Sequence, residues 1–177
     1  MTNTNIFRLY ASISLCFFLF NLNAQNTFIQ NKGQLPKQIS AKVNLPSGSL
    51  FIEQGKLTYA FYSGEQLASV HDLKISNKEI DAHSFVMDFV NSNTDVSTEL
   101  LEESRYYENY FLGDELNWVE DVKSYKSLYQ KNIYRGIDVQ YYVERDRLKY
   151  DIIVEPRASI SILKIKYDGV ENIRLQE

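Results

Sequence analysis

The sequence predicts an all-β domain with an antiparallel, sandwich-like sheet. Apolar and polar residues alternate with a period of two over much of residues 25–177, as in half-buried strands. No stretch sustains the apolar period of 3.6 that marks a helix. Turn-forming pairs such as Gln54-Gly55 and Asp168-Gly169 separate the alternating stretches. Roughly 150 residues suffice for one ordinary core, so we predict a single domain over residues 25–177.

Residues 1–24 are typical of a secretory signal peptide. Arg8 gives a weakly basic start, an apolar run extends from Leu9 to Leu22, and a small residue precedes Gln25. The apolar run is shorter than the ~20 residues that a membrane-spanning helix needs, although a retained anchor is the alternative. We therefore predict export and a mature chain that begins at Gln25.

Predicted strands occupy residues 50–53, 57–62 and 84–89 in the first half of the chain. Gln54-Gly55 supplies a hairpin turn between the first two of them. Apolar side chains occupy one face of the other two strands: Leu57, Tyr59, Phe61, Phe85, Met87 and Phe89. This face is expected to lie in the core.

Loops are predicted at residues 91–97 and 112–120, and a short helix is predicted between Ser97 and Tyr107. Oxygen-bearing side chains from the first loop to Glu102 have the spacing of a calcium loop. Val96, however, occupies the place where such a loop needs glycine. Solvated loop residues explain the same pattern, so we predict no metal site.

The clearest predicted hairpin pairs residues 137–144 with residues 148–154, around a turn at Arg145-Asp146. Pro156 ends the second strand because proline cannot donate to a β-ladder. Another strand carries Leu163, Ile165 and Tyr167, and a further one is predicted from Val170 to Leu175. The sequence ends shortly after Leu175, so we expect a sheet that is incomplete at its C-terminal edge. An open edge of this kind invites self-association.

No group of residues predicts a catalytic centre. His71 and His83 are the only histidines, and Asp81 and His83 share one strand face while Ser84 lies on the other, so these three cannot form a triad. The mature chain has two histidines and no cysteine, so it offers few of the usual metal ligands, and we predict no metal or other cofactor. We therefore predict that the protein is not an enzyme. A hydrolase that uses paired carboxylates from residues 99–121 is a weaker alternative.

Charge is unevenly distributed along the chain. The whole sequence has a net charge of −4, and loss of Arg8 with the signal changes it to −5, which argues against a nucleic-acid partner. In residues 99–121 eight acidic residues face one basic residue, whereas basic residues outnumber acidic ones in residues 123–166. Two explanations are open for these acidic and basic surfaces: they are solvated faces, or they are complementary docking surfaces for a neighbouring domain.

Two aromatic residues are candidates for ligand binding. Trp118 lies in a predicted loop, and Tyr142 lies on the polar face of its predicted strand. Exposed aromatic rings can stack on sugar rings, so the alternative function is a carbohydrate-binding module.

Five segments carry a recognisable pattern: residues 28–34 (FIQNKGQ), 109–114 (NYFLGD), 122–125 (VKSY), 132–138 (NIYRGID) and 148–156 (LKYDIIVEP). In this order they resemble the N-terminal domain of large secreted cell-surface proteins of Bacteroidota. In that family the domain precedes SBBP β-propeller-type repeats and often a gliding-motility or type IX secretion sorting domain. The family's glycine-rich turn is replaced here by Arg145-Asp146, and the family domain continues beyond the last residue of this sequence. This departure implies either a truncated copy or fragment, or a short secreted form whose sheet is completed by something else.

The shared segments look structural, because Gly33 and Gly136 suit tight turns and Asn31 and Asp138 can brace loops. The resemblance implies no catalytic residue. It implies an exported domain, extracellular or associated with the outer membrane of a Gram-negative bacterium. We therefore predict a structural or interaction role at the cell envelope or outside the cell, with other protein domains or cell-surface components as partners, and glycans in the alternative reading.

Overall fold

A computed structural model describes residues 26–71, 79–144 and 147–174. The strands are β1 (Phe28–Gln30), β2 (Ile39–Leu45), β3 (Gly48–Glu53), β4 (Lys56–Tyr62), β5 (Ala82–Phe89), β6 (Ser97–Tyr110), β7 (Val119–Tyr134), β8 (Ile137–Glu144), β9 (Arg147–Val154) and β10 (Ile165–Asp168). The helices are α1 (Gly64–His71) and the 3-10 turns η1 (Glu115–Asn117) and η2 (Ile160–Ile162). The predicted signal peptide and the predicted turn at Arg145-Asp146 lie outside the described residues.

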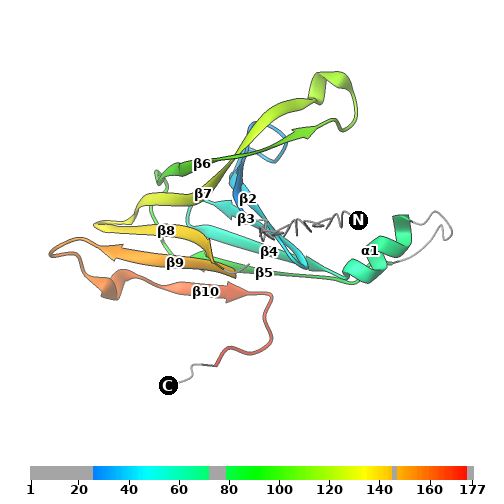
Figure 1. Cartoon of the computed structure of the whole chain (residues 1–177). Coiled ribbons are helices and arrows are strands. Elements are labelled where there is room, and N and C mark those ends of the chain that lie inside the picture. Colours follow the sequence, from blue (N-terminus) through cyan, green and yellow to red (C-terminus); the bar gives the residue numbers. More distant parts are fainter. Residues whose placement is uncertain (1–25, 72–78, 145–146, 175–177) are drawn as a thin grey trace, which may run out of the picture.

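The strands form one antiparallel sheet in the order β10-β5-β4-β3-β2-β1-β7-β8-β9, and β6 pairs with β7 off this path. The sheet curls into an open half-barrel, so its two halves face each other (Figure 1). The predicted all-β, antiparallel fold is therefore confirmed. Its sandwich-like character arises from one continuous sheet, because the short strand β1 pairs with both β2 and β7 and joins the halves.

The core fills the concave side of this sheet. Its fully or almost fully buried members include the following apolar side chains from both halves: Phe28, Val43, Leu50, Ile52, Leu57, Met87, Phe89, Leu128, Ile133, Ile137, Val139 and Tyr141. The predicted inward faces of β4 and β5 are confirmed by Leu57, Met87 and Phe89. Since the described residues include no cysteine, their stability depends on this packing.

A buried glutamine connects the two halves across the core. Gln130 of β7 is fully buried, and its side-chain amide donates to the Glu53 carbonyl oxygen at 2.7 Å. Its side-chain oxygen accepts from the Tyr141 hydroxyl at 3.3 Å and from the Gly55 amide at 3.4 Å. The hairpin turn between β3 and β4 is thereby attached to β7, which helps to hold the sheet in its curled form.

Several predicted elements are confirmed in detail. The β8–β9 hairpin pairs Tyr141 with Tyr150, and β9 ends at Val154, two residues before Pro156. In the loop after β1, the Asn31 side chain donates to three carbonyl oxygens and accepts from two amides, as expected of a bracing residue. Gly33 has a φ of 118°, the left-handed region that glycine tolerates.

Other expectations were wrong. Residues 97–107 form part of the 14-residue strand β6, because β6 pairs along β7 with two register shifts and this pairing overrides the local helical preference of a glutamate- and leucine-rich segment. Helix α1 was not predicted, although Ser63 caps it by accepting the Gln66 amide at 3.3 Å. The strand predicted from Val170 is not formed in the described part, residues 170–174.

The two outer strands of the sheet that the structure describes, β9 and β10, do not pair with each other. Within the described chain, β9 pairs only with β8, and β10 pairs only with β5. None of the described helices is both long and apolar enough to cross a membrane.

Candidate functional site

The β6–β7 hairpin projects beyond the rest of the sheet (Figure 1). Strand β7 pairs with β8 from Ser127 onward and with β1 only at Ser124 and Tyr125, so its first residues, 119–123, pair with β6 alone. Residues 111–118 connect the two strands and are called the hairpin tip below. Gly113, with a φ of 70°, and η1 shape this connection.

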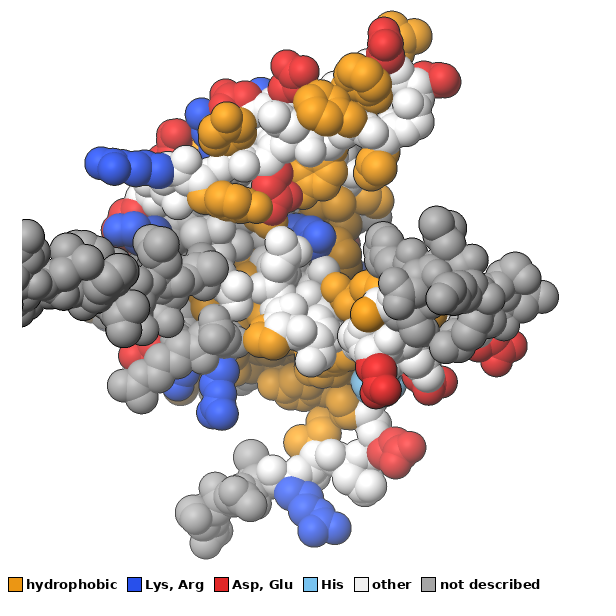
Figure 2. Space-filling model, turned by 45° about the vertical axis from the view of Figure 1, so that its right-hand side comes forward, with side chains coloured by type: hydrophobic (Ala, Val, Ile, Leu, Met, Phe, Trp, Pro, Cys, Tyr) orange, Lys and Arg blue, Asp and Glu red, His pale blue; other side chains and the backbone are white. Residues whose placement is uncertain are grey.

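The hairpin tip exposes large apolar side chains. Leu116 is 98% exposed, Leu112 74%, Phe111 51% and Trp118 42%. The rings of Phe111 and Trp118 pack edge to face with 5.0 Å between their centroids, so they form one aromatic unit. Figure 2 shows hydrophobic and acidic side chains gathered at this projecting end, at the top of the view.

Carboxylates surround these apolar side chains. Among the described residues, the side chains of Asp114, Glu115 and Glu120 form no hydrogen bond or ion pair. Asp121 differs, because the Lys123 ammonium lies 2.6 Å from it and its hydrogen bond lowers the pKa of that carboxyl. The hairpin tip therefore combines exposed apolar surface with unpaired negative charge.

The two predicted ligand-binding residues are not brought together. Trp118 lies in the hairpin tip, whereas Tyr142 of β8 is opposite Ser127, nine residues farther along β7, which corresponds to about 30 Å of strand. The Tyr142 hydroxyl donates to Asp151 at 3.3 Å. A single binding platform cannot contain both residues.

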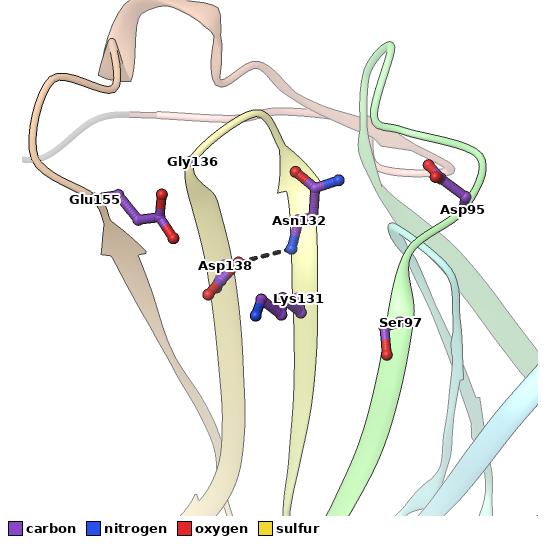
Figure 3. Close-up of a pocket in the computed structure, with 7 residues that line it drawn as sticks. All are labelled: Asp95, Ser97, Lys131, Asn132, Gly136, Asp138 and Glu155. Atoms are coloured by element: carbon purple, nitrogen blue, oxygen red, sulfur yellow. Dashed lines mark hydrogen bonds between the residues drawn. The ribbon is translucent and has the colours of Figure 1, made fainter.

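A shallow depression of about 300 Å³ lies near the other end of β7 (Figure 3). Both carboxylate oxygens of Asp138 are engaged there: one accepts from the Asn132 amide at 2.6 Å, and the other accepts from the Tyr129 hydroxyl. This hydrogen bond raises the pKa of Tyr129 to about 12. Asn132 has a φ of 61° and lies in a bulge of β7, so Asp138 braces this bulge, whereas the sequence predicted that it would brace a loop.

A second depression of about 420 Å³ adjoins the first and is called the arginine depression below. It is lined by Arg135, Gly136, Glu155, Pro156, Arg157, Ala158, Ser159 and Ile162. Arg135 and Arg157 are exposed, and within the described chain neither forms an ion pair or a side-chain hydrogen bond. Ile162 and the neighbouring Ile160 are also exposed, so basic and apolar groups meet at this surface.

A tight turn and a loop bring the two arginines together. The Glu155 amide donates to the Gly136 carbonyl oxygen at 2.9 Å, which holds the loop after β9 against the β7–β8 turn. Gly136 has a φ of 72°, and a Cβ atom there would lie 2.8 Å from the Ala158 Cβ. Glycine is required at this position for both reasons.

The residues considered for catalysis and calcium binding do not converge on a reactive centre. Asp81 pairs with Gln66 at 2.8 Å, while His83 and Ser84 are exposed on β5. Ser97 and Glu102 lie in strand β6 and not in a loop that could wrap around an ion. Across the ranges that the structure describes, no group of three or more His, Cys, Asp or Glu residues is placed to hold a metal ion. The side chain of His71 lies outside this description.

Sequence reasoning identified Trp118 but missed the larger surface around it. The available signal was the presence of Phe111, Leu112 and Leu116 in or next to a predicted loop, where no strand or helix periodicity accounts for them. The shared position of Arg135 and Arg157 at one depression had no such signal, since it depends on a contact between two separate loops.

Comparisons with known proteins give one match. A family model with the description "Domain of unknown function (DUF7948)" matches residues 28–177. No curated protein and no solved structure matches the chain.

Proposed function

The chain belongs to the DUF7948 family of domains of unknown function, and we propose that it is an exported, non-enzymatic interaction domain whose hairpin tip is its contact surface. One observation carries this proposal: Leu116 is 98% exposed, at the end of a hairpin that projects from the sheet. A partner at the cell envelope or outside the cell would cover this end.

The energetics of the hairpin tip favour a binding role. Full burial of a large apolar side chain contributes roughly 1.5–3 kcal/mol, and the hairpin tip offers four such side chains. Aromatic side chains are also enriched among the residues that dominate binding at protein interfaces. Since Phe111 and Trp118 already pack on each other, their ordering on binding costs little conformational entropy.

The strand pairing of the hairpin supports the same role. The ladder between β6 and β7 runs from Ser97 opposite Lys131 to Tyr110 opposite Val119. Lys32, from the loop after β1, donates to the Glu120 carbonyl oxygen at 2.9 Å and braces the base of the projecting part. A braced hairpin presents its end in a defined orientation, which suits a docking element.

Export is supported by the pattern of residues 1–24, which is typical of a signal peptide. The likeness of five segments to secreted Bacteroidota domains favours the cell surface, with other protein domains or surface components as partners. Both observations support a proposed interaction outside the cytoplasm.

Photo-crosslinking tests the proposal directly. A photoreactive amino acid replaces Leu116 in the full chain, expressed in its native host, and the matched control replaces Leu67, an exposed leucine of α1. We expect a protein adduct of higher mass from position 116 and none from position 67. The absence of an adduct at position 116, or equal adducts at both positions, would overturn the proposal.

Carbohydrate binding is the alternative, because Trp118 is partly exposed at the same tip. A glycan array with the wild type, Trp118→Ala, Tyr142→Ala and Leu116→Ala separates the two functions. Glycan binding that is lost in Trp118→Ala and retained in Leu116→Ala would favour the sugar, whereas a wild type that binds no glycan excludes it. Since Tyr142 lies about 30 Å of strand away, its substitution should leave binding at the tip unchanged.

A further inference from the structure

We propose that the hairpin tip of one copy docks into the arginine depression of a second copy of this chain, so that copies associate head to tail. This inference rests on the proposed function, because it names the partner of the same tip.

The two surfaces are complementary in charge. The carboxylates of Asp114 and Glu115 flank Leu116 at the tip, and within the described residues they lack a counter-ion. Arg135 and Arg157 line the depression and lack a counter-ion in the same part of the chain. Guanidinium groups bind carboxylates through two parallel hydrogen bonds, which gives such a contact directional specificity.

The surfaces also match in apolar character. Leu116 projects from the tip almost fully exposed, and Ile160 and Ile162 are 56% and 41% exposed beside the arginines. Burial of these side chains against one another supplies the nonpolar free energy, while the ion pairs set the orientation.

Carboxylates in and next to the arginine depression carry the wrong charge for an acidic tip. Glu155 lies between the two depressions, and Asp95 and Asp138 line the neighbouring one (Figure 3). These carboxylates repel an acidic tip, so the docked tip must be held by the two arginines.

Strand β7 separates the two surfaces within one molecule. Its first residue, Val119, follows the hairpin tip, and its last, Tyr134, precedes Arg135 of the depression. At ~3.3 Å per residue these ends lie roughly 50 Å apart along the strand. A copy therefore cannot dock its own tip, and the contact must join different molecules. Because the contact uses two different surfaces, it can repeat and produce a chain or a ring of copies.

Sedimentation velocity with paired variants tests this arrangement. The tip variant carries Asp114→Arg and Glu115→Arg, and the depression variant carries Arg135→Glu and Arg157→Glu. All proteins are expressed from the full-length sequence and then purified. Circular dichroism and the melting temperature confirm that each is folded. We expect the wild type to form a concentration-dependent series of oligomers and each variant alone to be monomeric.

An equimolar mixture of the two variants is the decisive sample. In this mixture the unchanged acidic tips meet unchanged arginine depressions, and the arginine-bearing tips meet the glutamate-bearing depressions, so we expect the mixture to restore the series of oligomers that neither variant forms alone. A chain that carries all four substitutions should associate with itself again, since the charges are exchanged on both surfaces. A monomeric wild type at high concentration, or variants that fail to pair, would overturn the inference.

Two outcomes separate this inference from the proposed function. If position 116 crosslinks to another protein and the wild type is monomeric, the tip is a contact surface but its partner is not a second copy. If both variants alone still form oligomers, association proceeds through the open strands β9 and β10, and the head-to-tail arrangement is wrong.

Discussion

Gln130 provides the sharpest test of how the curled sheet is held together. We predict that Gln130→Leu destabilises the domain by about 2 kcal/mol, because burial of a polar group without a partner costs ~1–3 kcal/mol. The substitution removes the 2.7 Å hydrogen bond to the Glu53 carbonyl oxygen and the longer bonds from Tyr141 and Gly55. Leucine is similar in size, so the packing volume changes little and the loss of hydrogen bonds dominates.

Urea unfolding, followed by Trp118 fluorescence, measures this cost. A loss of about 2 kcal/mol corresponds to a fall of roughly 4–8 °C in the melting temperature of a domain of this size. The matched control is Gln140→Leu in β8, since Gln140 is half-buried and its side chain forms no hydrogen bond with the described residues. The control should change stability by less than about 0.5 kcal/mol.

Equal effects of Gln130→Leu and Gln140→Leu would refute the reasoning, because they would show that the hydrogen bonds across the core add nothing. A changed dependence on urea concentration would instead indicate altered compactness and not a simple loss of stability.

Three further predictions concern the backbone, pH and salt. Gly48→Ala should lower the melting temperature clearly, because its Cβ would lie 2.0 Å from the Ala60 carbonyl oxygen, whereas Gly64→Ala meets nothing within 4 Å and should be tolerated. Burial raises the pKa of Tyr59 from 10.0 to about 12, so its neutral form stabilises the fold below pH 10 and this contribution is lost as the pH rises from 10 to 12. Tyr59→Phe should therefore lose less stability than the wild type between pH 10 and 12, by about 1 kcal/mol after allowance for solvent screening, and equal losses in urea titrations would contradict this. Added salt should weaken the proposed self-association, because salt screens the attraction between exposed charges and the Debye length is already ~10 Å at 0.1 M. Oligomers that are insensitive to salt would argue against the charge pairing.

Alternation along the chain was sufficient to predict β3, β4, β5, β8 and β9, but the inner strands β1, β2 and β7 were not predicted. Leu57 and Met87 lie opposite each other in the sheet and point into the core, as their spacing implies. Strand β6 was mispredicted because Leu100, Leu101 and Glu102 favour a helix locally, while its strand conformation depends on pairing with β7. The residues of β6 alone do not reveal that β7 will pair with them.

The candidate site was predictable only in part. Trp118 was identified because it lies in a predicted loop, and Leu116 could have been identified on the same ground. Arg135 and Arg157 come together through the turn at Gly136 and its hydrogen bond from Glu155, so their proximity is a tertiary property. Head-to-tail complementarity could therefore be inferred only from the folded chain.

Hydroxyl-radical footprinting would test most directly the central claim that the hairpin tip is a contact surface. Oxidation of Phe111 and Trp118 is compared between cells that display the chain and the dilute purified protein, with Tyr62, an exposed tyrosine at the end of β4, as the internal reference. We predict that the two tip residues are protected on cells while Tyr62 is oxidised equally in both samples. Equal oxidation of Trp118 in the two samples would contradict the claim.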